Sequence, residues 1–131
     1  MTLKTALVVS ILGLMPIEVL AQQQPPSPAL GIEGHAAVER LVGNTMTGTA
    51  GGLPYFAFYD KGGTVKMQRG GEVASGQWSS DGDDLCEEFP DDDDETCYTI
   101  KLDPGGAKGT MTDTDGTAYE IEVLPGNPQK L

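Results

Sequence analysis

The chain has 131 residues, and 20 acidic side chains against 8 Lys or Arg give it a formal net charge of −12. This charge is repelled by nucleic acid and by anionic lipid headgroups, so we expect neither as a partner. The length is that of one domain, and such a field attracts a basic protein, a cationic peptide or a metal cation.

The N-terminal region has the three parts of a secretory signal peptide over residues 1–21. Lys4 supplies the positive charge, residues 6–14 form an apolar run, and Ala21 ends a cleavage site of small residues. The apolar run is shorter than the roughly 18–20 residues that span a bilayer, so we expect no membrane span after signal removal. We therefore predict a periplasmic or secreted protein.

Residues 22–31 are rich in Pro and Gln and are predicted to form a flexible leader to a single domain over residues 32–131. The domain begins with one short predicted helix over residues 34–43, whose expected role is to cap an open end of a sheet. Its apolar residues at helical spacing are Ala37, Val38, Leu41 and Val42. Gly43 stands where a helix ends.

We expect the domain to be a monomer.

From Thr45 onward the apolar period changes from helical spacing to alternation, and turn signals recur at short intervals. Strands are predicted over residues 53–60, 64–68, 72–79, 84–89, 96–102 and 117–124. The connections are too short for parallel crossovers, so neighbouring strands must be antiparallel. A long meander tends to close, because closure removes exposed edges. We predict an all-β, up-and-down meander of about seven or eight strands, forming a barrel or a curved half-barrel, with one short N-terminal helix.

Alternation also sorts the aromatic side chains between the faces of the sheet. In the last predicted strand, Tyr119, Ile121 and Val123 face inward. The aromatic residues either line a ligand-holding mouth of the barrel or form its core, and we interpret them as core because a small barrel has little free interior. These residues are Phe56, Phe58, Tyr59, Trp78, Tyr98 and Tyr119.

Two cysteines, Cys86 and Cys97, lie close together in the predicted domain. In an oxidising compartment, two such cysteines most simply form a disulfide with each other. The alternative is metal binding, but a structural zinc site takes four ligands and two thiolates supply only half of them. We expect the disulfide.

An acidic cluster surrounds the cysteines. Its members, with no Lys or Arg among them, are Asp81, Asp83, Asp84, Glu87, Glu88, Asp91, Asp92, Asp93, Asp94 and Glu95. If the cysteines pair across two strands, residues 91–95 form the tip of that hairpin. The tip is a docking site for a basic partner, a weak calcium site with Asp91, Asp93 and Glu95 as ligands, or a solvated tip without a ligand.

Sequence signals for an enzyme are weak. His35 is the only histidine, lies next to the leader, and has no nucleophile placed beside it by the sequence. No Gly-x-Ser-x-Gly motif is present. Residues 113–120 look faintly like a calcium loop, but the glycine comes too early for an EF-hand, so we predict a hairpin turn there. We expect no catalytic residue and no required cofactor.

The motif Gly76-x-Trp78, followed by Asp81-Gly-Asp83, Leu85-Cys86 and Cys97-Tyr98, resembles a family of small exported bacterial β proteins known only as a domain of unknown function. The resemblance covers roughly residues 38–124. It implies an exported β domain with Cys86 and Cys97 paired, and it supplies no catalytic residue. The strongly acidic stretch between the cysteines departs from the family pattern.

These observations favour an exported, non-enzymatic binding or envelope-accessory module. Its acidic hairpin, with Asp91, Asp92, Asp93, Asp94 and Glu95, would engage a basic protein or peptide through charge complementarity. The first alternative is a domain in which Ca²⁺ orders the same residues. A small periplasmic enzyme is the second alternative.

Overall fold

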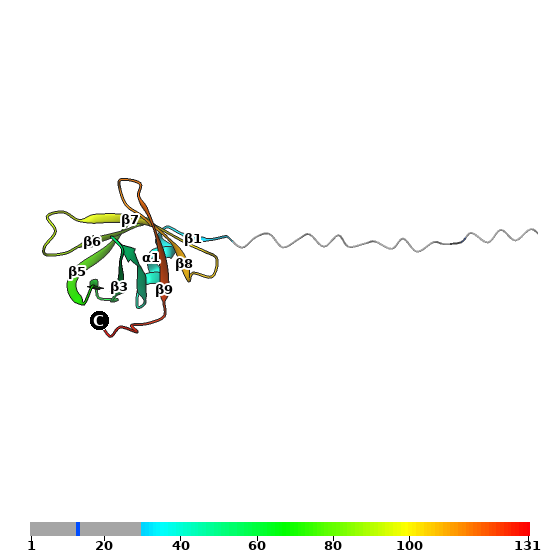
Figure 1. Cartoon of the computed structure of the whole chain (residues 1–131). Helices are drawn as coiled ribbons and strands as arrows, with labels where there is room; N and C mark the ends of the chain where they lie inside the picture. Colours follow the sequence, from blue (N-terminus) through cyan, green and yellow to red (C-terminus); the bar gives the residue numbers. More distant parts are fainter. Residues whose placement is uncertain (1–12, 14–29) are drawn as a thin grey trace, which may run out of the picture.

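The computed structural model describes Gly13 and residues 30–131 (Figure 1). The predicted signal peptide and leader therefore fall outside the described residues, apart from Gly13, Leu30 and Gly31, and stay predictions. In the part that is described, no helix has both the length and the apolar character needed to cross a bilayer.

Strands β2 to β9 form a closed antiparallel barrel in which each strand pairs with the next, and β9 pairs back with β2. The strands are β2 (Thr45–Ala50), β3 (Leu53–Tyr59), β4 (Thr64–Arg69), β5 (Glu72–Asp81), β6 (Asp84–Glu88), β7 (Thr96–Leu102), β8 (Lys108–Thr112) and β9 (Ala118–Leu124). This arrangement confirms the predicted all-β meander, and it is the closed barrel rather than the half-barrel. Closure leaves none of these strands with an unpaired edge.

A short additional strand, β1 (Ile32–Glu33), pairs antiparallel with β7 just beyond the first residue of β6, with Ile32 opposite Leu102. The sequence pattern did not predict this strand. Its two residues are too few to show an alternating pattern, so only the pairing with β7 defines them.

Helix α1 (His35–Leu41) closes one end of the barrel. Its inward residues Ala37, Val38 and Leu41 are all essentially fully buried in the hydrophobic core. The helix ends where Gly43 takes a positive φ of 77°, a conformation that glycine adopts without steric cost. The predicted capping role is confirmed, and we call this the plugged end.

The core fills the barrel next to the helix, with Tyr59, Leu85 and Ile100 fully buried. Trp78 packs edge-on against Tyr59 with ring centroids 6.3 Å apart, and its indole N–H donates to the carbonyl of Asp60 at 2.8 Å. These contacts give Trp78 of the Gly-x-Trp motif a structural role.

The glycine of that motif is also structural. Gly76 lies on β5, against the ring of Phe89, and a Cβ atom there would approach Phe89 Cδ1 to 2.7 Å. The missing side chain therefore lets the Phe89 ring lie directly on the backbone of β5.

Cys86 and Cys97 form a disulfide between β6 and β7, where they are direct partners in the strand register with Cα atoms 4.0 Å apart. The predicted pairing is confirmed. The bond closes the base of the β6–β7 hairpin, and residues 91–95 form its exposed tip as expected.

Candidate functional site: the mouth of the barrel

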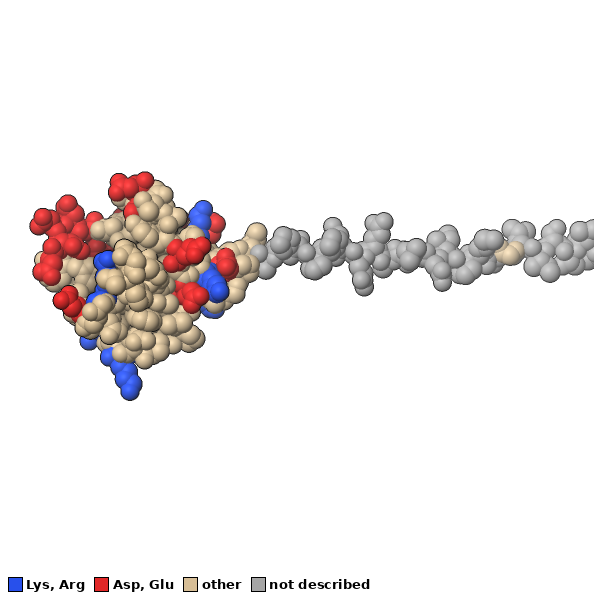
Figure 2. Space-filling model, in the orientation of Figure 1, with Lys and Arg blue, Asp and Glu red and all other residues tan. Residues whose placement is uncertain are grey.

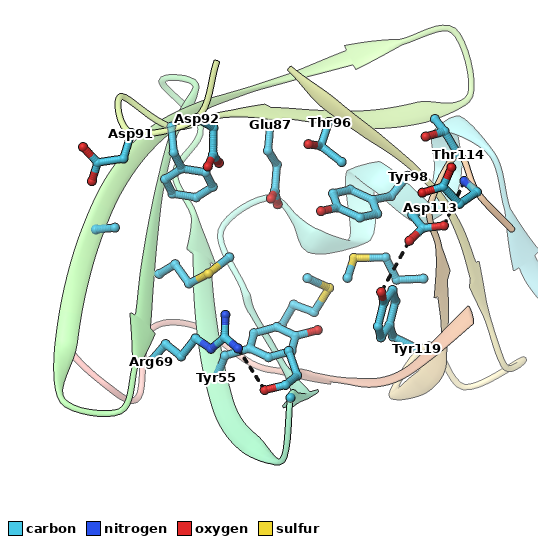
Figure 3. A pocket seen from close by; sticks show the side chains of 18 residues that line it. Tyr55, Arg69, Glu87, Asp91, Asp92, Thr96, Tyr98, Asp113, Thr114 and Tyr119 are labelled. Carbon is cyan, nitrogen blue, oxygen red and sulfur yellow. Dashed lines mark hydrogen bonds between the residues drawn. The ribbon is translucent and has the colours of Figure 1, made fainter. Parts of the chain in front are cut away.

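The end of the barrel opposite α1 is open and leads into a cavity of about 690 Å³ (Figure 3). The hairpins β2–β3, β4–β5, β6–β7 and β8–β9 surround it, and we call this end the mouth. Its walls are partly polar and partly apolar, and the apolar and aromatic side chains among them are Met46, Met67, Phe89, Met111, Tyr55, Tyr98 and Tyr119. The site is therefore a concave, partly apolar pocket of the kind that holds a ligand or a side chain.

The prediction that the six aromatic residues form only core is wrong in part. Tyr98 and Tyr119 pack against the core but also line the cavity. Phe56 and Phe58 alternate with the buried side of β3 and stay outside the core cluster.

Glu87 is a carboxylate in the interior of the mouth. It alternates along β6 with the inward Leu85, so its side chain faces the barrel lumen and is only 5 % exposed. The Tyr59 hydroxyl donates a hydrogen bond to Glu87 Oε1. Burial raises the pKa of Glu87, and the bond from Tyr59 partly opposes this shift.

Among the described residues, no cation pairs with this carboxylate. The ion pairs among the described residues all lie elsewhere, at the exposed pairs His35–Glu39, Lys101–Glu33 and Lys108–Glu122. A buried carboxylate without a positive partner is costly, so Glu87 is an unusual feature of this interior.

Tyr55 supplies a second polar group without a partner. The residue is 4 % exposed, and its buried hydroxyl has no hydrogen-bond partner in the part of the chain that the structure describes. Its ring lies over Gly48 of β2, where an added Cβ atom would be 2.9 Å from the hydroxyl oxygen. Burial raises the pKa of Tyr55 to about 12, with the charge of Glu87 as the next cause.

Two more tyrosines face the cavity from its other side. Figure 3 shows the Tyr98 hydroxyl pointing toward the Glu87 carboxylate. Burial, followed by the charge of Glu87, raises the pKa of Tyr98 to about 12. The Tyr119 hydroxyl donates to Asp113 Oδ2 at 3.4 Å. Three tyrosines and the Glu87 carboxylate therefore line the interior of the mouth.

The rim above this interior is acidic on one side. Asp91 and Asp92 line the cavity from the tip of the β6–β7 hairpin, and Asp113 and Asp115 line it from the β8–β9 hairpin. Figure 2 shows red side chains gathered over both tips. Arg69 lies on the opposite wall, where its guanidinium donates to the carbonyl of Ala50 at 3.1 Å.

The predicted acidic tip is thus divided. Asp91 and Asp92 belong to the cavity lining, whereas Asp93, Asp94 and Glu95 do not. All five are at the tip that the sequence predicted. Glu87, by contrast, is separated from the rest of the acidic cluster and was missed, although its alternation with Leu85 is a signal that could have found it.

The predicted calcium ligands do not converge. Within the described part of the chain, one group of three acidic, cysteine or histidine residues has ligand atoms within 4.8 Å of one another, and it consists of Cys86, Glu95 and Cys97. Both sulfurs of that group are consumed by the disulfide. Calcium binding by Asp91, Asp93 and Glu95 stays a prediction that this geometry does not favour.

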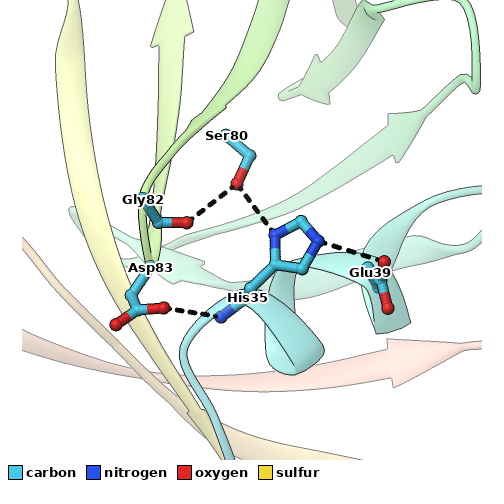
Figure 4. A network of polar contacts seen from close by, with 5 residues as sticks. All are labelled: His35, Glu39, Ser80, Gly82 and Asp83. Atoms are coloured by element: carbon cyan, nitrogen blue, oxygen red, sulfur yellow. Dashed lines mark hydrogen bonds and ion pairs between the residues drawn. The ribbon is translucent and has the colours of Figure 1, made fainter.

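His35 lies at the plugged end, on the outer surface (Figure 4). Its Nδ1 is 3.3 Å from the Ser80 hydroxyl, its Nε2 is 3.1 Å from Glu39 Oε1, and its backbone N–H donates to Asp83. The expectation that no hydroxyl lies beside His35 is therefore wrong, because the β5–β6 hairpin folds back onto the helix. The imidazole is 59 % exposed and lines no part of the mouth, so these contacts attach α1 to the hairpin.

The geometry defines an eight-stranded meander barrel with one end plugged by a helix and an acidic, tyrosine-lined mouth at the other. No protein-family model, curated protein or solved structure matches this chain.

Proposed function

We propose that this protein is an exported, non-enzymatic binding module that engages a basic protein or peptide at the mouth of its barrel. One observation carries the proposal: acidic residues from two separate hairpins meet at the rim of a cavity that already contains a buried carboxylate. The predicted acidic hairpin thereby becomes one side of a larger binding surface.

Electrostatics support a basic partner. The formal net charge of −12 produces a negative field around the molecule, and the four rim aspartates concentrate it where the surface is concave. Fields focused in this way speed the encounter with an oppositely charged partner and make the binding sensitive to salt.

Two further observations support the non-enzymatic and exported parts of the proposal. The lining of the mouth includes no His, Ser or Cys side chain that could pair a nucleophile with a base. The Cys86–Cys97 disulfide is typical of a protein that folds in an oxidising compartment.

Isothermal titration calorimetry with capped pentalysine tests the proposal. We expect binding in low salt that weakens roughly tenfold or more in high salt, because exposed charges are screened there. The absence of binding in low salt, or binding that ignores salt, would overturn the proposal.

A matched pair of variants locates the surface. The double variant Asp91→Asn and Asp92→Asn should weaken pentalysine binding several-fold, while Glu39→Gln with Asp103→Asn, at the plugged end, should change it less than about twofold. Both double variants remove two negative charges. Asp113 is left unchanged, because its carboxylate accepts the backbone N–H groups of Asp115 and Thr117 and holds the turn. Equal losses in the two double variants would remove the mouth from the proposal.

A further inference from the structure

We propose that Glu87 is the anchor for one ammonium or guanidinium group, carried by a lysine or arginine side chain of the basic partner that enters the mouth end-on. This inference rests on the proposed function, since it names the part of the partner that the cavity receives. It goes further because it assigns a specific acceptor inside the barrel rather than an acidic surface.

Glu87 takes part in none of the ion pairs among the described residues. Glu87 is 5 % exposed, and its one hydrogen-bond partner among the described residues is the neutral hydroxyl of Tyr59. Arg69 is the cation on the cavity wall, but its guanidinium is directed to the carbonyl of Ala50. A buried carboxylate is stabilised by a charged, hydrogen-bonding partner, and here that partner has to come from outside.

Tyr55 lines the same cavity, and its buried hydroxyl has no hydrogen-bond partner among the described residues. A hydroxyl oxygen has lone pairs that accept an N–H, and an ammonium group has three N–H donors. Glu87 and Tyr98 line the cavity as well, and Figure 3 shows the Tyr98 hydroxyl pointing toward Glu87. An unsatisfied buried hydroxyl in a cavity is expected where a ligand completes the hydrogen bonding.

Apolar side chains line the cavity together with these polar groups. Met46, Met67 and Met111 line the cavity, and methionine side chains adapt to irregular aliphatic groups. Lysine and arginine have apolar stems that pack on such walls while the charged end finds its partner. A calcium ion instead takes six to eight oxygen ligands, and among the described residues no three carboxylates of this cavity bring oxygen atoms within 4.8 Å of one another. The chemistry therefore favours an organic cation on an aliphatic stem.

Two capped pentapeptides test the inference, one with a single lysine between glycines and one with norleucine, its uncharged analogue, in the same place. NMR titration of the full chain should show that the lysine peptide binds roughly tenfold or more tightly than the norleucine peptide. The variant Glu87→Gln should abolish this preference, and Glu39→Gln, which removes the same charge at the plugged end, should keep it. Equal binding of the two peptides by the unchanged protein would overturn the inference.

Tyr55→Phe provides a second variant with a distinct signature. Because the hydroxyl has no hydrogen-bond partner among the residues that the structure describes, its removal should leave the melting temperature unchanged or higher, yet weaken binding of the lysine peptide several-fold. A Tyr55→Phe protein that loses stability but keeps its affinity for the lysine peptide would contradict the assigned role of this hydroxyl as an acceptor.

The two proposals fail in different ways. If Glu87→Gln keeps the lysine preference while Asp91→Asn with Asp92→Asn still weakens pentalysine binding, the anchor is wrong and the acidic mouth stands. If the unchanged protein binds no pentalysine, the mouth itself is wrong, and the anchor falls with it.

Discussion

The two ends of the barrel differ in where their polar groups lie. At the plugged end, α1 inserts Ala37, Val38 and Leu41 into the core, and its polar contacts stay on the outer surface. At the mouth, the polar groups lie inside: within residues 30–131, Glu87 is buried without a cation and the Tyr55 hydroxyl is buried without a hydrogen-bond partner. The same meander of hairpins thus ends in an apolar seal on one side and in an open polar cavity on the other.

This difference indicates that the plugged end contributes stability and that the mouth is suited to binding. Apolar burial at the plugged end stabilises the barrel. Buried polar groups that lack partners lower the stability of the unliganded protein, and natural proteins retain such groups mainly at functional sites. Removing a buried apolar side chain at the plugged end should therefore lower the stability, whereas removing an unpartnered polar group at the mouth should not, and four predictions examine the two ends.

The largest effect is expected from Leu41→Ala at the plugged end. Leu41 is fully buried, so the substitution leaves a cavity between helix and barrel and should lower the free energy of unfolding by about 4 kcal/mol. Urea denaturation measures the loss, and pentalysine affinity should be unchanged at a temperature where the variant is folded. Leu53→Ala is the control, because Leu53 is 49 % exposed and should cost less than about 1 kcal/mol. Similar losses for the two variants would contradict the sealing role of the helix.

The second largest effect is expected from the disulfide at the base of the acidic hairpin. Replacing Cys86 and Cys97 together by Ser opens a ring with a sequence separation of 11 residues, and the entropy of the unfolded chain should lower the stability by about 3 kcal/mol. Unlike Leu41→Ala, this change also loosens the rim, so pentalysine should bind more weakly at a temperature where the protein is folded. Unchanged affinity would show that the rim is fixed by strand pairing alone.

Most of the fold was predictable from the sequence, because each part of it is encoded locally. Alternation along residues 117–124 placed Tyr119, Ile121 and Val123 inward, and the structure has Ile121 buried and the other two half-buried. Turn signals between the strands excluded parallel crossovers, and they left closure or curvature as the alternatives. The spacing of Ala37, Val38 and Leu41 predicted the capping helix.

The mouth could not be predicted in the same way, because its contacts join distant parts of the chain. Glu87 receives its hydrogen bond from Tyr59, 28 residues earlier. Within the acidic cluster of residues 81–95, the other acidic side chains are mostly exposed. The position of the Tyr55 ring depends on the absence of a side chain at Gly48 on the neighbouring strand. Likewise, the hydroxyl beside His35 comes from Ser80, 45 residues away.

A third prediction concerns the pH dependence of stability at the mouth. The pKa of Glu87 is raised in the folded protein above its ordinary value of 4.5. The favourable contribution of this carboxyl is therefore complete below the unfolded pKa and is lost as the pH rises through the folded pKa. Glu87→Gln should match the unchanged protein near pH 4 and become progressively more stable than it as the pH rises toward neutral.

Urea denaturation between pH 4 and 8 measures this difference. The phenols that face Glu87 stay neutral in this range, because burial raises the pKa of Tyr55 and Tyr98 to about 12 and that of Tyr59 well above its ordinary value. Glu39→Gln is the control and should follow the unchanged protein closely. A constant offset between Glu87→Gln and the unchanged protein across the range would contradict a buried, titrating carboxyl.

The smallest effect is expected at the outer surface of the plugged end. His35→Ala removes the contacts with Ser80 and Glu39, and exposed pairs of this kind contribute about 0.5 kcal/mol. Pentalysine binding should not change, because His35 lies at the end away from the mouth. A nitrophenyl ester assay checks the alternative, since a serine beside a histidine is the arrangement of a hydrolase. Hydrolysis that both His35→Ala and Ser80→Ala abolish would place chemistry at this end and contradict a purely structural plug.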